Sequence, residues 1–234
     1  MYGYYYFDPT YLLLVIGMVL SLLASAKVKS TFSVYSRVRS ASGLTGADAA
    51  RRILRMSGIT DVTVVPISGS LTDHYDPRSK VLRLSDATYQ SASVAAVGVA
   101  AHECGHAIQH TKGYAPLRIR SAIVPIANFG SAIAWPLILF GLLFNSRSSY
   151  MLIQIGIIAF SFAVLFQIVT LPVEFNASNR AVRILGESGI LSADELSMTR
   201  KVLGAAALTY VAGAASAILQ LLRIILLTGG RRRE

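Results

Sequence analysis

Four long apolar runs limit what this sequence can fold into. They cover residues 11–26, 122–144, 150–171 and 202–227. An α-helix needs about 20 apolar residues to cross the hydrocarbon core of a bilayer, and each run approaches or exceeds that length. Only 15% of the residues are charged, against about 25% in ordinary soluble domains. The sequence therefore predicts a mainly α-helical integral membrane protein.

The first run is predicted to be an uncleaved anchor. It ends in Ala24-Ser25-Ala26, which resembles a signal-peptidase site, but no Lys or Arg precedes it. Basic residues follow it instead: Lys27, Lys29, Arg37 and Arg39. Because cytoplasmic segments next to membrane spans are rich in Lys and Arg, the N-terminus should lie outside and the following segment in the cytoplasm. We thus expect an N-terminal transmembrane anchor over residues 1–29.

The next two runs predict a transmembrane hairpin over residues 122–171, with spans at about 122–144 and 150–171. The hairpin returns the chain to the cytoplasm and delivers a second polar segment, residues 172–201. Basic residues in that segment fit the cytoplasmic side: Arg180, Arg183, Arg200 and Lys201.

The last apolar region, residues 202–234, allows two interpretations. Arg223 interrupts it, Ala212-Gly213-Ala214 could break it, and a fourth crossing would place the basic tail Arg231–Arg233 outside. The region is therefore either a fourth span or a re-entrant helix pair.

A small α+β domain is expected between the anchor and the hairpin, over residues 30–121. Thr45-Gly46-Ala47-Asp48 resembles a capping box and predicts a helix that stops near Gly58. Residues 62–65 and 80–85 have strand character and predict a small sheet with one shielded strand. Ala, Val and Ile at helical spacing predict a buried helix over about residues 93–110.

The run His102-Glu103-Cys104-Gly105-His106 lies on that last helix. Four residues apart, the two histidines project from one face and can reach one tetrahedral Zn²⁺. Glu103 lies beside them and can take a proton from a zinc-bound water. Two satisfied core histidines would be the alternative, but burying imidazoles and a carboxylate in an apolar helix is costly unless they are paired or bind metal. The pattern predicts Zn²⁺ as cofactor.

A catalytic zinc needs a third protein ligand and an open position for water. Lys112 stands where a metzincin would place its third histidine, which excludes that class. On a continuous helix His110 lies about 12 Å from His102, too far to share the metal. Glu174 is the preferred third ligand, because it follows an apolar run and begins a polar helix. The alternative is an interfacial carboxylate paired with Arg180 or Arg183.

Several stretches closely resemble the YugP-like neutral zinc metallopeptidases of bacterial membranes. They are residues 69–109, which include Leu71-Thr72-Asp73-His74-Tyr75-Asp76-Pro77, and the stretches 171–178 and 205–212. The resemblance implies a zincin-type (gluzincin) metalloprotease domain at the membrane surface. It also implies roles for four residues: zinc ligation by His102, His106 and Glu174, and general-base catalysis by Glu103.

The resemblance raises two further expectations. Related HtpX-type proteases carry an Asp where this chain has Ser178, so the partner of a ligating histidine should be Ser178, Asn176 or a backbone carbonyl. Residues 71–77 should form a wall of the active site. His74 is then the candidate donor to the oxyanion or contact to the substrate, with Tyr75 and Tyr210 as alternatives.

The predicted function is a zinc endopeptidase in the cytoplasmic membrane, with its site on the cytoplasmic side and a peptide or membrane-protein substrate. A non-catalytic zinc-binding scaffold is the alternative, but a structural site needs a fourth protein ligand, and Cys104, the only cysteine, faces away from the histidines. The net charge of +10 does not predict nucleic-acid binding, because Lys and Arg cluster beside apolar runs and not among exposed aromatics. The sequence leaves open a membrane adaptor protein or a homo-oligomer.

Overall fold

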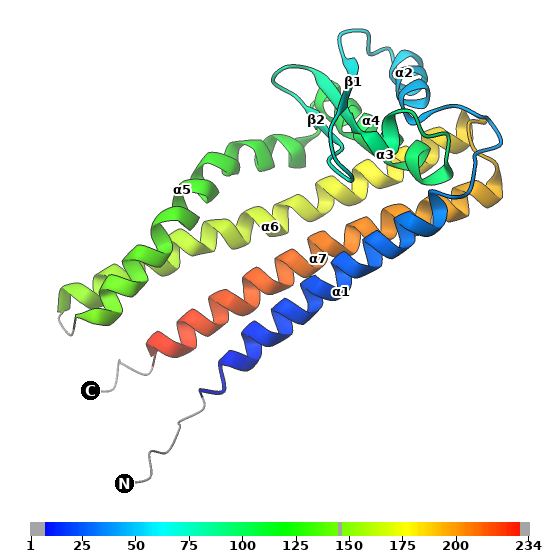
Figure 1. Cartoon of the computed structure of the whole chain (residues 1–234). Coiled ribbons are helices and arrows are strands. Elements are labelled where there is room, and N and C mark those ends of the chain that lie inside the picture. The colour runs from blue at the N-terminus through cyan, green and yellow to red at the C-terminus, as the bar shows by residue number, and fades with distance from the viewer. Residues whose placement is uncertain (1–7, 145–146, 230–234) are drawn as a thin grey trace. The chain divides into compact units, whose positions relative to one another are not determined.

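The computed structural model describes residues 8–144 and 147–229, which group into two compact units (Figure 1). The first, here called the apolar unit, comprises Met1–Leu23, Arg120–Val169 and Tyr210–Glu234. The second, the polar unit, comprises Ala24–Ile119 and Thr170–Thr209. Four long helices contribute residues to both units, and each unit is described by itself.

The four long helices have the length and apolar composition of membrane spans. They are α1 (Tyr11–Tyr35), α5 (Ala115–Leu143), α6 (Arg147–Glu187) and α7 (Ala193–Gly229). Many of their large hydrophobic side chains are exposed, as contact with lipid requires. These features fit a multi-pass membrane protein.

Two of these helices are longer than the sequence suggested. The sequence predicted a separate polar helix beginning at Glu174, whereas α6 runs unbroken past Pro172 to Glu187. Similarly, α7 is one helix through Ala212–Ala214, where a break was considered. The basic tail Arg231–Arg233 and the start of the turn after α5 lie outside the described residues.

Within the apolar unit, α1 and α7 approach each other closely at a small residue. A Cβ atom on Gly17 would lie 3.2 Å from the Oγ of Ser216, so a larger residue at position 17 would press on α7. Ser216 also donates a hydrogen bond of 2.9 Å to the carbonyl of Gly17. Small residues and interhelical hydrogen bonds of this kind are how helices associate in membranes, where there is no hydrophobic effect to drive packing.

The polar unit contains a three-stranded sheet in the order β1-β3-β2. Strand β1 (Thr63–Ile67) pairs in parallel with β3 (Val81–Ser85), and β2 (His74–Asp76) pairs antiparallel with β3. The sequence predicted β1 and β3, and it predicted one shielded strand: β3 lies in the middle, with Leu82 and Leu84 fully buried. Pro66 does not end β1 because β1 is an edge strand, where proline is tolerated.

Three helices accompany the sheet: α2 (Gly46–Met56), α3 (Asp86–Tyr89) and α4 (Val94–Thr111). The predicted N-cap of α2 is confirmed, since the Thr45 hydroxyl accepts a hydrogen bond from the amide of Asp48. Ser93 caps α4 in the same way, through the amide of Ala96. Both helices therefore begin at side chains that satisfy their first free N–H groups.

The core of the polar unit forms around α4. Its buried side chains come from α2, β3, α4, the end of α6 and α7; they include Ile53, Leu82, Val97, Leu185 and Leu203. Cys104 lies within this core, and its thiol faces the carbonyl of Ala50 on α2 at 3.6 Å. One face of α4 is thus fixed against the core, which leaves another face for the histidines.

Candidate metal centre

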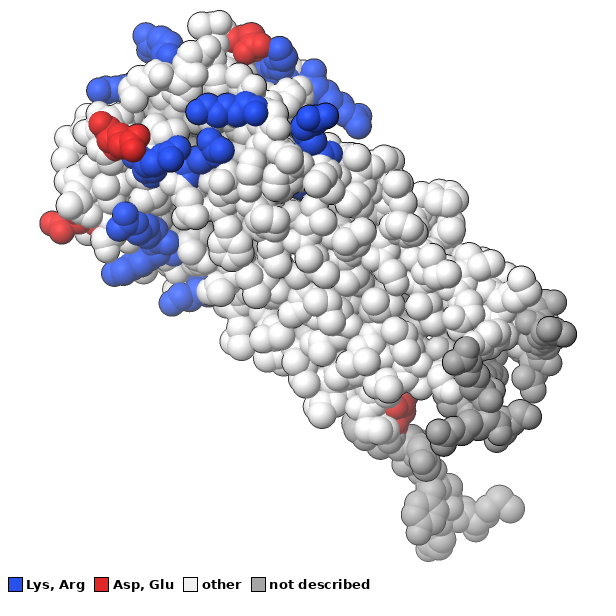
Figure 2. All heavy atoms as spheres, turned by 180° about the vertical axis from the view of Figure 1, so that it is seen from behind, with Lys and Arg blue, Asp and Glu red and all other residues white. Residues whose placement is uncertain are grey.

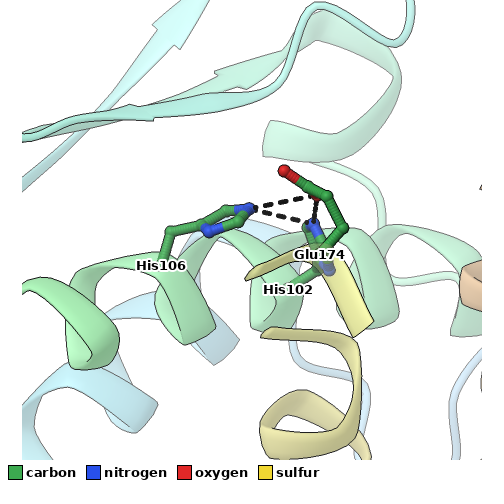
Figure 3. Close-up of side chains that lie close together, drawn as sticks. All are labelled: His102, His106 and Glu174. Atoms are coloured by element: carbon green, nitrogen blue, oxygen red, sulfur yellow. Dashed lines mark hydrogen bonds and ion pairs between the residues drawn. The ribbon is translucent and has the colours of Figure 1, made fainter. Parts of the chain in front are cut away.

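His102 and His106 lie one turn apart on α4, and Glu174 reaches them from α6 (Figure 3). The Nε2 atoms of the two histidines are 3.2 Å apart. The Oε2 atom of Glu174 lies 3.3 Å from Nε2 of His102 and 3.5 Å from Nε2 of His106. The three side chains that the sequence singled out as ligands therefore converge on one point.

The triangle formed by these three atoms has the size of a zinc site. In a tetrahedral complex with bonds of about 2.0–2.1 Å, neighbouring ligand atoms lie roughly 3.3–3.4 Å apart. The observed sides of 3.2, 3.3 and 3.5 Å bracket that value. Among the described residues, this is the one group of three or more His, Cys, Asp or Glu side chains close enough to hold a metal ion.

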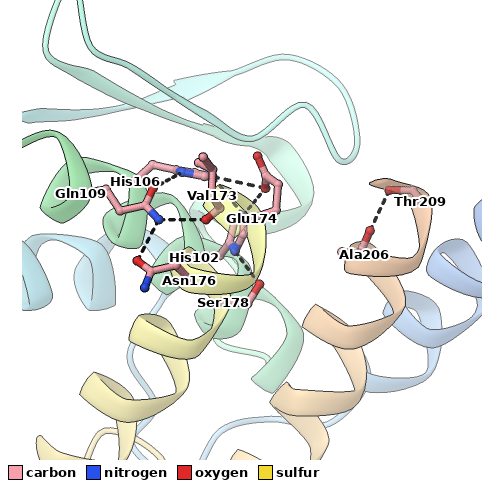
Figure 4. A network of polar contacts seen from close by, with 9 residues as sticks. All are labelled: His102, His106, Gln109, Val173, Glu174, Asn176, Ser178, Ala206 and Thr209. Atoms are coloured by element: carbon pink, nitrogen blue, oxygen red, sulfur yellow. Dashed lines mark hydrogen bonds and ion pairs between the residues drawn. The ribbon is translucent and has the colours of Figure 1, made fainter. Parts of the chain in front are cut away.

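Gln109 fixes the orientation of the His106 ring (Figure 4). Its side chain is fully buried, and its Nε2 donates to the carbonyl of Val173 at 2.8 Å and to Oδ1 of Asn176 at 3.0 Å. Because the amide nitrogen is committed to two acceptors, Oε1 must be the atom that faces Nδ1 of His106, at 3.1 Å. Nδ1 of His106 therefore carries the hydrogen, and Nε2 keeps its lone pair for a metal.

Ser178 is the corresponding partner of His102. Its Oγ lies 3.1 Å from Nδ1 of His102, and a hydroxyl can accept the ring hydrogen there. This contact supports one of the replacements considered for the Asp that related proteases carry at position 178. With both rings held by Nδ1, two nitrogen lone pairs and a carboxylate oxygen face one another, and a cation at the centre removes their mutual repulsion.

Gly105 allows α6 to come close enough for Glu174 to reach the histidines. A Cβ atom on residue 105 would lie 2.7 Å from the carbonyl oxygen of Ala177, a distance at which something must shift. The missing side chain at position 105 therefore permits the close approach of α6. The position of Glu174 next to the histidines therefore depends on a residue between them that cannot itself bind metal.

The electrostatics of the site favour positive charge. Burial by itself lowers the pKa of His106, but its hydrogen bond to Glu174 and the charge of Glu103 outweigh burial, and the pKa is raised above the ordinary value for histidine. A field that stabilises a proton on the imidazole also stabilises a metal cation. The side chains of His102 and His106 are 12% and 13% exposed, so a small part of the site remains open to solvent.

Glu103 lies on α4 next to His102 and is 7% exposed. Its charge is among the causes that raise the pKa of His106. The Cys104 side chain points the other way, into the core, and burial raises the pKa of its thiol. Cys104 is therefore not a metal ligand in this arrangement.

The other residues considered as ligands or partners make contacts elsewhere. Nδ1 of His110 pairs with the Tyr75 hydroxyl at 2.9 Å, so neither joins the metal cluster. Arg180 donates to Asn176 at 2.7 Å, and Arg183 faces Glu187. The alternative in which Glu174 pairs with Arg180 or Arg183 is thus not what the structure has.

The ring of His74, the candidate oxyanion donor, makes its hydrogen bond within its own segment. His74 lies on β2 with an exposed ring whose Nδ1 donates to the carbonyl of Thr72 at 2.9 Å. Nε2 of a neutral His74 is then an acceptor, and only a protonated ring could donate to an oxyanion. Tyr210 belongs to the apolar unit. The role of His74 stays a prediction.

The sequence did not single out Gln109. It follows His106 by three residues, which puts it on the same side of α4. The sequence shows that spacing, but an amide at such a position is common in helices. The role of Gln109 here depends on its contacts with Val173 and Asn176, which come from a distant segment.

Comparison with known proteins gives one family. A family model described as "Putative neutral zinc metallopeptidase" matches residues 10–229. The "Putative membrane protease YugP" of Bacillus subtilis (strain 168) is 49% identical over 222 residues, which are 95% of this chain and 97% of that protein. No solved structure matches the chain significantly.

Proposed function

The chain belongs to the neutral zinc metallopeptidase family, and on that premise we propose that it is a membrane-embedded zinc endopeptidase of the gluzincin type. In this proposal His102, His106 and Glu174 hold Zn²⁺, and Glu103 is the general base. The substrates are peptide segments or membrane proteins at the membrane surface.

The proposed reaction assigns a separate task to each residue. Zn²⁺ in this site would supply Lewis-acid activation of a water and of the scissile carbonyl. Glu103 takes a proton from the attacking water and returns it to the leaving amine. Gln109 and Ser178 keep the two imidazole rings turned toward the ion, so the ligands need not reorganise when it binds.

The observation that carries the proposal is the number of ligands. The described residues supply three protein ligands, and a tetrahedral zinc then has one position left for water. A structural zinc would close that position with a fourth protein ligand, and the only cysteine faces the core instead. The arrangement supports an enzyme over a scaffold.

The proposal includes the side of the membrane. Lys27, Lys29, Arg37 and Arg39 follow the first apolar run, and cytoplasmic segments are the ones enriched in Lys and Arg. The segment between the first two apolar runs, which carries His102 and His106, is therefore assigned to the cytoplasmic side of the cell membrane.

The test is Glu103→Gln in the full-length protein, purified in lipid nanodiscs with zinc. We expect normal zinc content and a rate of cleavage of an unfolded reporter polypeptide lowered by about 100- to 10,000-fold, the usual contribution of a general base. Glu187→Gln is the control, because it removes an exposed carboxylate of the same unit and should leave the rate unchanged.

Cleavage at the wild-type rate by Glu103→Gln would show that the base is misassigned. X-ray absorption at the zinc edge tests the rival function separately. Two imidazole nitrogens with oxygen ligands fit the enzyme, whereas a zinc–sulfur distance near 2.3 Å would indicate a closed structural site involving Cys104.

A further inference from the structure

A hollow lies in the polar unit. It has a volume of about 470 Å³ and lies between the last turns of α1 and the early turns of α7. Nine residues line it: Lys27, Ser30, Thr31, Val34, Tyr35, Lys201, Gly204, Ala205 and Leu208. None of them is acidic, and none belongs to the set assigned to zinc.

The lining offers hydrogen-bond donors without protein acceptors. Two ammonium groups come from different helices, Lys27 from α1 and Lys201 from α7. The hydroxyl groups of Ser30, Thr31 and Tyr35 lie on the same wall. Among the described residues, none of these five side chains makes a hydrogen bond or an ion pair. Such a set fits a phosphate group, whose oxygens accept several charge-assisted hydrogen bonds.

The two lysines stand at the borders of apolar runs. Lys27 directly follows the first run, and Lys201 directly precedes the last one. The charged heads of lipids lie at that level of a bilayer. Leu208, an apolar side chain at the same hollow, lies inside the last run and can contact the glycerol and upper acyl region.

We propose that this hollow binds the headgroup phosphate of an anionic phospholipid. Basic pockets at the cytoplasmic ends of membrane helices have the charge and the depth for that ligand. The proposal does not depend on peptidase activity. It predicts that the protein binds this lipid even if the metal centre has another function.

Two neighbouring basic residues provide a control that distinguishes a specific site from a general attraction to anionic membranes. Lys29 lies two residues from Lys27, and Arg200 lies next to Lys201. Both are exposed, but neither lines the hollow. Replacing them removes the same charge at the same border and leaves the hollow intact.

Gly204 offers a second, charge-neutral way to test the site. A Cβ atom at this position would meet nothing within 4 Å, because it would point into open space at the hollow. Gly204→Leu therefore fills the hollow without pressing on the protein, and Leu is a better helix former than Gly. Loss of lipid in this variant cannot be ascribed to lost charge.

The experiment is native mass spectrometry of the full-length protein extracted from vesicles of phosphatidylglycerol and phosphatidylcholine in equal amounts. We expect retained phosphatidylglycerol in the wild type. A direct hydrogen bond to a charged group contributes about ten-fold or more, so K27Q/K201Q, which removes two such donors, should lower retention by about a hundred-fold. Gly204→Leu should lower it as well, whereas K29Q/R200Q should retain most of it.

Three results would overturn the proposal: equal losses in the two double variants, unchanged retention in Gly204→Leu, or equal retention of both lipids by the wild type. Added glycerol phosphate distinguishes the source of the phosphate. If it displaces phosphatidylglycerol at millimolar concentration or below, the site takes a soluble phosphate and the lipid assignment fails. Zinc content, measured on every sample, confirms that the variants are folded.

Discussion

The amide of Gln109 decides which nitrogen of His106 is available. Its amide nitrogen donates to Val173 and Asn176, so its oxygen has to accept from Nδ1 of His106. Asn176 is held in turn by Arg180, whose guanidinium also lies over the ring of Tyr114. A chain of side chains that are not themselves proposed ligands therefore sets the ring orientation of a proposed ligand.

Gln109→Leu should lower the affinity for zinc. The substitution removes the acceptor at Nδ1 of His106, and losses of partners of this kind usually cost about 10- to 100-fold in metal affinity. Competition with a fluorescent chelator would measure the change. Thr111→Val is the matched control, because it deletes a side-chain hydrogen bond to Ala107 on the same helix without touching the histidines. Equal affinities in the two variants would contradict the role given to Gln109.

The raised pKa of His106 predicts that the stability of the metal-free protein falls as the pH rises, whereas the affinity for zinc increases. In the metal-free protein, the stability from the protonated ring is fully present below the unfolded pKa and is lost as the pH rises through the folded pKa. Zinc needs the neutral ring, so its affinity rises over the same range. Unfolding measured from pH 6 to 8.5, with and without zinc, tests both signs. In His106→Ala this dependence of the metal-free protein should disappear.

At the level of elements, the metal centre depends on how closely two helices pack. The carbonyl of Ala177 on α6 lies where a side chain at position 105 of α4 would be. Overpacking of this kind costs about 1–3 kcal/mol, whereas exchanging Gly for Ala in a helix gains only about 1 kcal/mol. The steric cost should therefore exceed the gain in helix propensity, so that Gly105→Ala is destabilising.

Gly105→Ala should lower the free energy of unfolding and the zinc content together, since moving α6 away also moves Glu174. Gly204→Ala makes the same exchange in a helix where a Cβ atom meets nothing, and it should be neutral or stabilising by up to about 1 kcal/mol. Thermal unfolding and zinc analysis of both variants provide the measurement. Full zinc content in Gly105→Ala would show that α6 does not need this close approach.

Much of the local structure could be predicted, because it depends on residues close in sequence. The cap at Thr45, the strands around Val64 and Leu82, and the one-turn spacing of His102 and His106 all follow from short-range patterns. The contacts of Gln109 could not be predicted, because its partners lie on α6, far along the chain. Strand β2 was missed for a similar reason: three residues carry little periodicity of their own and depend on pairing with β3.

The continuity of α6 was the least predictable feature at this level. Polar residues after Pro172 indicated a new helix, since proline commonly marks a helix boundary. In a helix next to a membrane, neighbouring groups compensate for the hydrogen bond that proline removes. The periodicity of an apolar span therefore says little about where the helix itself ends.

At the level of the whole molecule, the basic residues are unevenly distributed. The protein has 22 Lys and Arg against 12 Asp and Glu, and in Figure 2 the Lys and Arg side chains gather over the polar unit while the apolar helices are almost uncharged on the face shown. Arg223 is one exception, and its guanidinium lies 4.7 Å from the ring centre of Tyr11 in the apolar unit. Such a contact stabilises a cation on an apolar helix.

This charge distribution predicts which side of the membrane each segment occupies. Cys104 is buried and its thiol has a raised pKa, so new cysteines can be labelled against an unreactive background. Ser70→Cys should react with a membrane-impermeant maleimide only after cells are opened, and Pro9→Cys should react in intact cells. Both sites are exposed. The reverse pattern would place the metal centre outside the cell.

The position of Glu174 on α6 also has a consequence for biosynthesis. Ribosomes make His102 and His106 first, and the complete helix α5 and most of α6 must follow before Glu174 exists. The nascent chain therefore lacks its proposed third ligand until α5 and the apolar part of α6 have been made. A peptidase assembled in this order would remain without a complete metal site while it is still being synthesised, and neighbouring proteins would be spared until insertion is well under way.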